Sequence, residues 1–316
     1  MLEEGNLQEE LERRKQRELE LERQKQLQKQ KRKELLSAKR KESKEIKTKH
    51  HRGRRKKSGK RNIISDIILV IAVIVFVFSA FKLFTIFNEY GKGDSEYEHI
   101  AQTVIQQVET DNSQENDDAT KEPKFVVDFG KLQEINADTV AWIRFDEPKT
   151  ISYPVVKGPD NDKYLKTTFE GNRNAAGTLF IDVKNARDFT DKNTFIYGHN
   201  MKNGSMFGQL RKYKNISFCN ENPYFYIYTP DGNCSKYEIF AAAIVKDTSE
   251  TYTYSFADDN AYMSYLQYVK NGALYTTDAE VGADSKIVTL STCTNVRDDE
   301  RLVVYGVLIE TTVAGE

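Results

Sequence analysis

Cysteine and histidine, the residue types best suited to nucleophilic and acid–base chemistry, are scarce in residues 124–316. This part of the chain holds three cysteines, Cys219, Cys234 and Cys293, and one histidine, His199. Cys293 and His199 each end a β-like apolar run and precede a polar loop, where a side chain can be presented to a cleft. An imidazole lowers the pKa of a nearby thiol and exchanges protons with the reactants, so this pair could perform acyl transfer. Taken alone, each residue could equally be structural.

Arg301 is the third candidate, and it opens the apolar run that follows Cys293 by eight residues. Arginine does not lose its proton, so it suits the stabilisation of developing negative charge better than base chemistry. Arg297 is a rival for this role. We prefer Arg301 because it directly precedes an apolar strand pattern.

Other common chemistries lack their motifs here. The chain has no HExxH, CxxC, GxSxG or phosphate-cradling glycine loop, so we predict no metal and no cofactor. Three cysteines are too few for a disulfide framework. Cys219 and Cys234 either pair in an oxidising exterior or stay as free thiols.

The elements that must position these residues are mainly strands. Eight short β-branched or aromatic runs bounded by turn residues predict a barrel or a sandwich. Two helices are also predicted, Phe129–Ile135 and Asn260–Asn271; the second shows an apolar face at helical spacing and follows a candidate N-cap in Ala257–Asp259. The predicted strands are Thr139–Phe145, Ser152–Val156, Thr178–Val183, Asn193–Tyr197, Tyr224–Tyr228, Lys236–Val245, Lys286–Ser291 and Leu302–Glu310.

A membrane anchor separates two regions of opposite charge. Residues 1–62 hold 23 Lys and Arg against 11 Glu, whereas the rest of the chain holds 24 against 37 Asp and Glu. Between them, Ile67–Phe87 has Lys82 as its one charge, and about 20 apolar residues span a bilayer core. The basic flank before the span predicts a single pass with a cytoplasmic N-terminus and an extracellular domain. The 62-residue segment before the anchor argues against a cleaved signal peptide.

Four regions follow from this pattern: a cytoplasmic basic tail at residues 1–62, a transmembrane signal anchor at 63–87, an extracellular stalk or linker at 88–123, and a catalytic domain at 124–316. The tail is expected to be partly helical and solvated, with weak heptad character. Its basic end, Lys47–Arg61, lies beside the span, which favours membrane lipids over nucleic acid as its partner. We therefore predict no nucleic-acid partner.

The motifs taken together resemble the sortase family, membrane-anchored cysteine transpeptidases of the Gram-positive cell surface. The resemblance rests on TLSTC (residues 289–293), YGHN (197–200) and the arginine at the next strand start. It looks like class B, because the helix at Asn260–Asn271 and an N-terminal helix, at Phe129–Ile135 or Ser95–Val108, fit that class. Asp160–Leu165 and Asn203–Phe207 are further matches. The resemblance implies an eight-stranded sortase-type β-barrel with short helices.

The resemblance also implies a mechanism and a set of partners. Cys293 would attack the threonine carbonyl of a sorting motif to form a thioester, His199 would move protons, and Arg301 would hold the carbonyl oxygen. The partners would be secreted proteins with an NPxTx- or LPxTG-like motif and a peptidoglycan precursor or cross-bridge amine. The positions that match the substrate groove, each of which could instead fill core or surface, are Asn161, Leu165, Tyr197, Tyr252, Thr253 and Ser291.

Three alternatives remain open at this point. The enzyme could polymerise pilin subunits through a lysine amine, it could be a general cysteine protease, or the chain could be a catalytically inactive membrane-tethered scaffold. The sequence does not distinguish the sorting motif or the acceptor amine.

Overall fold

The computed structural model describes residues 63–108 and 124–315. The predicted tail at residues 1–62 and the acidic linker at 109–123 lie outside the described residues. Internal contacts divide the chain into two units, one that ends at Ile74 and one that begins at Val75.

Helix α2 (Ile63–Val104) contains the segment that the sequence predicts as a membrane span. It is long and apolar enough to cross a bilayer, and no part of its apolar stretch is buried inside the protein. Phe76 and Phe84 are 73% and 69% exposed. Side chains of this size and polarity are stable at a surface that faces lipid, so the helix is a candidate membrane span.

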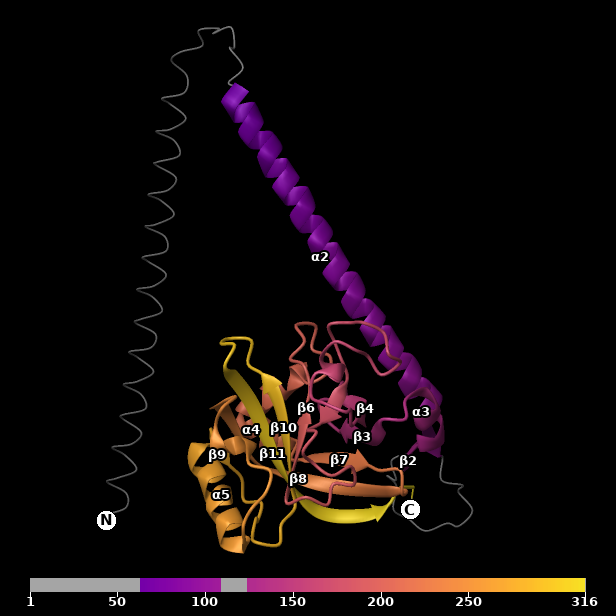
Figure 1. The fold of residues 1–316 in the computed structure, drawn as a ribbon, viewed down its shortest axis with the longest axis vertical. Helices are drawn as coiled ribbons and strands as arrows, with labels where there is room; N and C mark the ends of the chain where they lie inside the picture. Colours follow the sequence, from indigo (N-terminus) through magenta and orange to yellow (C-terminus); the bar gives the residue numbers. More distant parts are fainter. Residues whose placement is uncertain (1–62, 109–123, 316) are drawn as a thin grey trace, which may run out of the picture. The chain divides into compact units, whose positions relative to one another are not determined.

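Eight strands form a closed barrel (Figure 1). They are hydrogen-bonded in the order β11-β10-β6-β5-β4-β3-β7-β8, and a further β8–β11 pairing closes the ring. The pairs β4–β5 and β6–β10 are parallel, and the others are antiparallel. The strands are β3 (Thr139–Phe145), β4 (Ser152–Val156), β5 (Leu179–Ile181), β6 (Asn193–Tyr197), β7 (Tyr224–Tyr228), β8 (Asn233–Lys246), β10 (Ile287–Cys293) and β11 (Glu300–Val313).

The prediction of an eight-stranded barrel is confirmed, because each predicted run coincides with one barrel strand. The differences lie at the ends: β5 is shorter than its run, whereas β8 and β11 continue beyond theirs. Long polar stretches of β8 and β11 pair with each other past the apolar core, and ladder hydrogen bonds rather than side-chain burial extend them. The two-residue strand β9 (Tyr275–Thr276) adds to the edge of β8.

Short helices surround the barrel. These are α3 (Phe129–Ile135), α4 (Ile216–Glu221), α5 (Asp259–Gly272), and the 3₁₀ turns η1 (Lys163–Leu165), η2 (Gly208–Lys214) and η3 (Glu250–Tyr252). Helix α5 begins where Asp258 caps it, since the aspartate side chain accepts a hydrogen bond from the Ala261 backbone N–H at 2.8 Å. The predicted apolar face of α5, made of Tyr262, Tyr265, Leu266 and Val269, is buried.

Side chains along β10 alternate between two hydrophobic clusters, one on each face of the strand. Val288 and Leu290 belong to the barrel core, whereas Ile287 packs in the second cluster, under α5. Successive side chains of a strand point to opposite faces. Ser291 and Cys293 therefore follow Ile287 onto the outer face of the barrel, where a substrate can reach them.

The last turns of α2 pack into the second unit. Tyr97, Ile100 and Val104 are at most 5% exposed and belong to the barrel's hydrophobic core. The Tyr97 hydroxyl donates to the Gly177 carbonyl oxygen. After α2, strand β1 (Ile105–Val108) pairs with β2 (Lys124–Val127). The helical periodicity at Ser95–Val108 thus belongs to a buried helix end followed by a strand, while the predicted domain boundaries stay predictions.

Candidate active site

The sheet register brings the three candidate catalytic residues to one end of the barrel. Cys293 is the direct antiparallel partner of Arg301. On its other side, β10 runs parallel to β6, with Ser291 opposite Tyr197. Two residues beyond this pair are Cys293 and His199, so Cys293 has Arg301 beside it on one neighbouring strand and His199 just past the end of the other. Residues 94 apart in sequence are neighbours because β6 and β10 pair in this register.

A cavity of about 400 Å³ opens on this end of the barrel. It contains Cys293, His199 and Arg301 together with every predicted groove residue except Thr253. Thr253 instead closes the turn after η3, where its hydroxyl donates to the Glu250 carbonyl oxygen at 2.7 Å. The full lining is Asn161, Asp162, Leu165, Thr178, Phe180, Asp182, Tyr197, Gly198, His199, Asp247, Tyr252, Tyr254, Ser291, Thr292, Cys293 and Arg301.

Cys293 is half-buried, and its backbone is fixed by the loop that follows His199. The Asn200 side-chain amide donates to the Cys293 carbonyl oxygen at 2.7 Å. In return, the Asn295 side-chain amide donates to the Asn200 carbonyl oxygen at 2.7 Å. These reciprocal bonds hold together the two loops that carry the thiol and the imidazole.

His199 contacts the opposite wall of the cavity. Its Nε2 lies 2.7 Å from the Leu165 carbonyl oxygen. A carbonyl oxygen can only accept a hydrogen bond, so Nε2 carries the proton in this arrangement. The contact orients the ring and leaves the other ring nitrogen, Nδ1, for proton exchange.

Arg301 is held by a carboxylate and by backbone oxygens. Its Nη2 lies 3.2 Å from Asp247 Oδ2, and its Nη1 donates to the Asp298 carbonyl oxygen at 2.6 Å. Its side chain is 25% exposed. Arg297 has a 73% exposed side chain, pairs with Glu300, and is not part of the cavity lining. The geometry therefore favours Arg301 for a contact with a bound substrate.

Comparison with known proteins identifies the family. A family model described as the sortase domain matches residues 146–309. Sortase B of Listeria monocytogenes is 37% identical over 182 residues, which cover 56% of this chain and 72% of that protein. The chain belongs to the sortase family. Its relatives and structural neighbours are class B sortases, as the sequence motifs predict.

Two solved structures give the same fold. Sortase B of Clostridium perfringens is 32% identical, with a TM-score of 0.55 over 58% of this chain and 100% of that one. A Staphylococcus aureus sortase B–substrate complex is 28% identical, with a TM-score of 0.54 over 58% of this chain and 84% of that one.

A buried carboxylate organises the far wall of this sortase's cavity. Asp182 is 1% exposed, and its Oδ2 accepts hydrogen bonds from the hydroxyls of Tyr197 and Tyr254 at 3.0 and 2.9 Å. The same oxygen accepts from the Asn161 side-chain amide at 3.0 Å. Burial, with the neighbouring carboxylate adding to it, raises the pKa of Tyr254 to about 12. Sequence reasoning missed Asp182 and Tyr254, because neither belongs to a motif that we could interpret.

Two tyrosines of the cavity lining, Tyr197 and Tyr252, belong to a cluster of packed aromatic rings. Phe195 and Tyr197 both pack against Tyr252, with ring centroids 5.6 and 6.4 Å from it. The Tyr252 hydroxyl lies 2.9 Å from the Ser291 hydroxyl, and burial raises the pKa of Tyr252. The two tyrosines offer a substrate ring surface for apolar contact.

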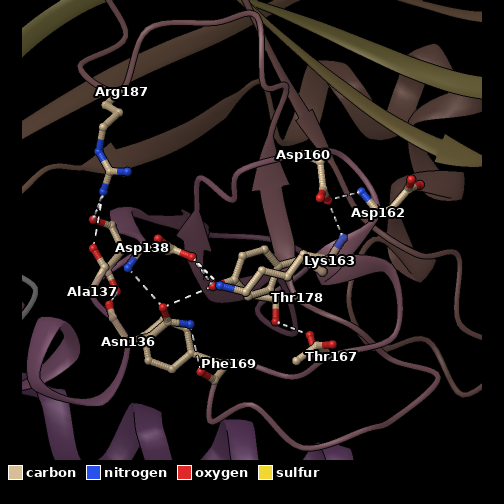
Figure 2. Close-up of polar contacts among 12 residues, drawn as sticks. Asn136, Ala137, Asp138, Asp160, Asp162, Lys163, Thr167, Phe169, Thr178 and Arg187 are labelled. Carbon is tan, nitrogen blue, oxygen red and sulfur yellow. Dashed lines mark hydrogen bonds and ion pairs between the residues drawn. The ribbon is translucent and has the colours of Figure 1, made fainter.

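Polar contacts of Asp160 and Lys163 hold the segment between Asn161 and Leu165 (Figure 2). Asp160 Oδ1 accepts from the backbone N–H of Lys163 at 2.8 Å. The Lys163 ammonium donates to Asp138 at 2.6 Å (Figure 2), and the Tyr164 hydroxyl donates to the same carboxylate at 2.7 Å. These contacts make η1 a rigid edge, which also provides the carbonyl oxygen that orients His199.

Neither of the other two cysteines lies in the cavity. Cys219 and Cys234 are both free thiols, the first buried and the second half-buried. Burial raises the pKa of each, which disfavours the reactive thiolate. Within residues 63–108 and 124–315, no three His, Cys, Asp or Glu side chains gather to hold a metal ion.

Proposed function

We propose that this sortase is a cysteine transpeptidase that cleaves a sorting motif after threonine and joins the protein to a peptidoglycan amine. The observation that carries the proposal is the cavity that contains Cys293, His199 and Arg301 at the ends of three adjacent strands. Relatives named sortase B support the reaction class.

In the first step, the Cys293 sulfur attacks the threonine carbonyl carbon. An S–C bond forms, and the carbonyl electron pair moves onto oxygen, beside the Arg301 guanidinium. The scissile C–N bond then breaks, and His199 as imidazolium gives its proton to the departing amine. The fixed guanidinium stabilises the oxyanion without reorganisation. The products are a thioester on Cys293, a neutral His199 and the released peptide.

In the second step, the acceptor amine attacks the thioester carbon. A C–N bond forms and the C–S bond breaks, so the electron pair returns to sulfur as thiolate. The proton lost by the amine passes to His199, which restores the imidazolium. The cycle thus exchanges one amide for another without a cofactor.

The groove residues fit an extended peptide. The residues that line the cavity together with Cys293 include Asn161, Leu165, Tyr197, Tyr252 and Ser291. We propose that this lining recognises an NPxTx- or LPxTG-like motif of secreted proteins. The Staphylococcus aureus sortase B–substrate complex is consistent with a peptide site of this kind.

The apolar half of α2 would anchor the enzyme in the cell membrane. We infer a cytoplasmic N-terminus, because residues 1–62 carry the excess of Lys and Arg. The catalytic domain would then face the cell wall, where both substrates occur.

The test is cleavage of quenched fluorescent peptides by the full chain in detergent micelles. Wild type should cleave at least one peptide that carries an NPxTx-like or LPxTG-like motif, and Cys293→Ala should cleave none of them. Without an acceptor, hydrolysis of the thioester gives a carboxylic-acid product. When a glycine amine is added, mass spectrometry should show that an amide with glycine replaces part of this product.

Each alternative predicts a different result. Hydrolysis with no amide product would indicate a protease, and a product formed only with a lysine side chain would indicate pilin polymerisation. Activity in Cys293→Ala would overturn the mechanism, and an inactive wild type across motifs would favour a scaffold.

A further inference from the structure

A second cavity, of about 250 Å³, carries unusual charge. Its wall includes Lys202, Arg211 and Lys214 and no acidic side chain, and we call it the basic cavity. Residues 63–316 hold 37 Asp and Glu against 24 Lys and Arg, so this is a local excess against the overall trend. Within the described part of the chain, none of the three cations has an ion-pair partner.

The helical geometry of η2 places two of these cations side by side. A 3₁₀ helix has three residues per turn, so Arg211 and Lys214 lie on the same side. Lys212 lies elsewhere, with its ammonium 5.3 Å from the centre of the Phe218 ring. The chain thus holds a neighbouring cation of the same helix outside the basic cavity.

The basic cavity shares a wall with the active-site cavity. Three consecutive pairs, His199–Asn200, Cys293–Thr294 and Arg301–Leu302, form that wall. The first residue of each pair lines the active-site cavity, and the second lines the basic cavity. A group bound in the basic cavity would therefore sit just behind the catalytic loops.

The wall also supplies neutral polar groups. Thr294 and Asn295 line the basic cavity, and Asn295 bonds the Asn200 carbonyl, which links the two loops. Two lysines, an arginine and an amide match an oxygen anion, because arginine can bind a carboxylate or a phosphate through two parallel hydrogen bonds.

We propose that the basic cavity binds a carboxylate or phosphate group of the acceptor substrate while its amine attacks the thioester. The inference rests on the proposed function. With the acyl peptide in the active-site cavity, an acceptor whose anion is held in the basic cavity would lie next to the loops that carry His199 and Cys293, and its amine would reach the thioester across them. Peptidoglycan precursors carry both anions, carboxylates on the peptide stem and a diphosphate on the lipid-linked form.

The experiment compares three acceptors with one shared amine. Gly-Gly-Gly-Ser-amide is neutral, Gly-Gly-Gly-Asp-amide adds a carboxylate, and Gly-Gly-Gly-phosphoserine-amide adds a phosphate. For the full chain in detergent micelles, the acceptor KM should be about tenfold lower for at least one anionic peptide, as charge-assisted hydrogen bonds give. A lower KM for the aspartate peptide alone indicates that the cavity binds a carboxylate of the peptide stem. A lower KM for the phosphoserine peptide alone indicates that it binds the diphosphate.

The double variant Arg211→Gln with Lys214→Gln should remove the difference between acceptors, and the matched control Lys212→Gln should keep it. The proposal is overturned if wild type has equal KM values for the neutral and anionic acceptors. It is also overturned if the double variant keeps the KM difference or if Lys212→Gln loses it.

A second measurement separates this proposal from the proposed function. Calorimetric titration of the full-length chain with inorganic phosphate needs no catalysis. Binding that the double variant loses supports the basic cavity even if no sorting peptide is cleaved, and absence of binding to wild type counts against it. Failure of peptide cleavage alone overturns only the proposed function.

Discussion

At the scale of the residue, Arg301 differs from a surface arginine by its fixed guanidinium. Contacts to Asp247 and to backbone oxygens hold it beside the register position of Cys293. A lysine would keep the charge but lose the planar fork that these contacts orient.

We predict that Arg301→Lys lowers kcat/KM for peptide cleavage by about 100-fold, the size of a lost oxyanion contact. The control is Arg297→Lys, which changes an exposed side chain outside the cavity and should keep wild-type kinetics. Steady-state cleavage of a quenched peptide measures both. If Arg297→Lys lowers kcat/KM more than Arg301→Lys does, Arg297 and not Arg301 makes the oxyanion contact.

The half-buried Tyr254 of the cavity wall should affect stability at high pH. The pKa of Tyr254 is raised to about 12, chiefly by burial, against about 10 for an unfolded tyrosine. Below pH 10 both states hold the proton. Between pH 10 and 12 the unfolded state loses it first, so the free energy of unfolding falls as pH rises.

Urea unfolding between pH 8 and 12 should show this fall, and Tyr254→Phe should make it shallower. The matched control is Tyr268→Phe, which removes the hydroxyl of a tyrosine that is 38% exposed. An unchanged slope in Tyr254→Phe would contradict the assignment.

At the scale of the element, the N-cap of α5 should contribute measurable stability. Replacing Asp258 by alanine leaves the Ala261 N–H without its side-chain acceptor, and a lost cap costs about 1 kcal/mol. Thermal unfolding should show a lower midpoint for Asp258→Ala than for Asp259→Ala, whose side chain is in the first turn but does not cap. Equal midpoints would show that the cap has no net effect.

Elements were more predictable than contacts between them. The eight strands and α5 followed from local periodicity and turn residues. The β6–β10 pairing that joins His199 to Cys293 depends on a parallel register, which local patterns do not encode. Asp182 could not be predicted for the same reason, since its three side-chain donors come from distant positions.

At the scale of the whole molecule, the barrel depends on residues before it. Ile100 is 1% exposed in the barrel core, although it belongs to the region that the sequence predicts as a stalk. Ile100→Ala should lower the free energy of unfolding by about 2–5 kcal/mol through the cavity it leaves. Fluorescence of the single, buried Trp142 reports the transition in urea.

The control is Gln102→Ala on the same helix, where an exposed side chain is removed. If both variants unfold at the same urea concentration, the end of α2 contributes nothing to the stability of the barrel.

The closed ring of strands has a consequence for recognition. Strands β6, β10 and β11 each have a hydrogen-bonded neighbour on both sides. An extended peptide therefore cannot join the sheet beside Cys293 as an added strand, the sequence-tolerant mode that many peptide-binding domains use. Its backbone must rely on scattered donors and acceptors, while side-chain pockets supply most of the selectivity. If the proposed function holds, such a site would read a short motif through its side-chain pockets and would not bind extended segments through their backbone alone.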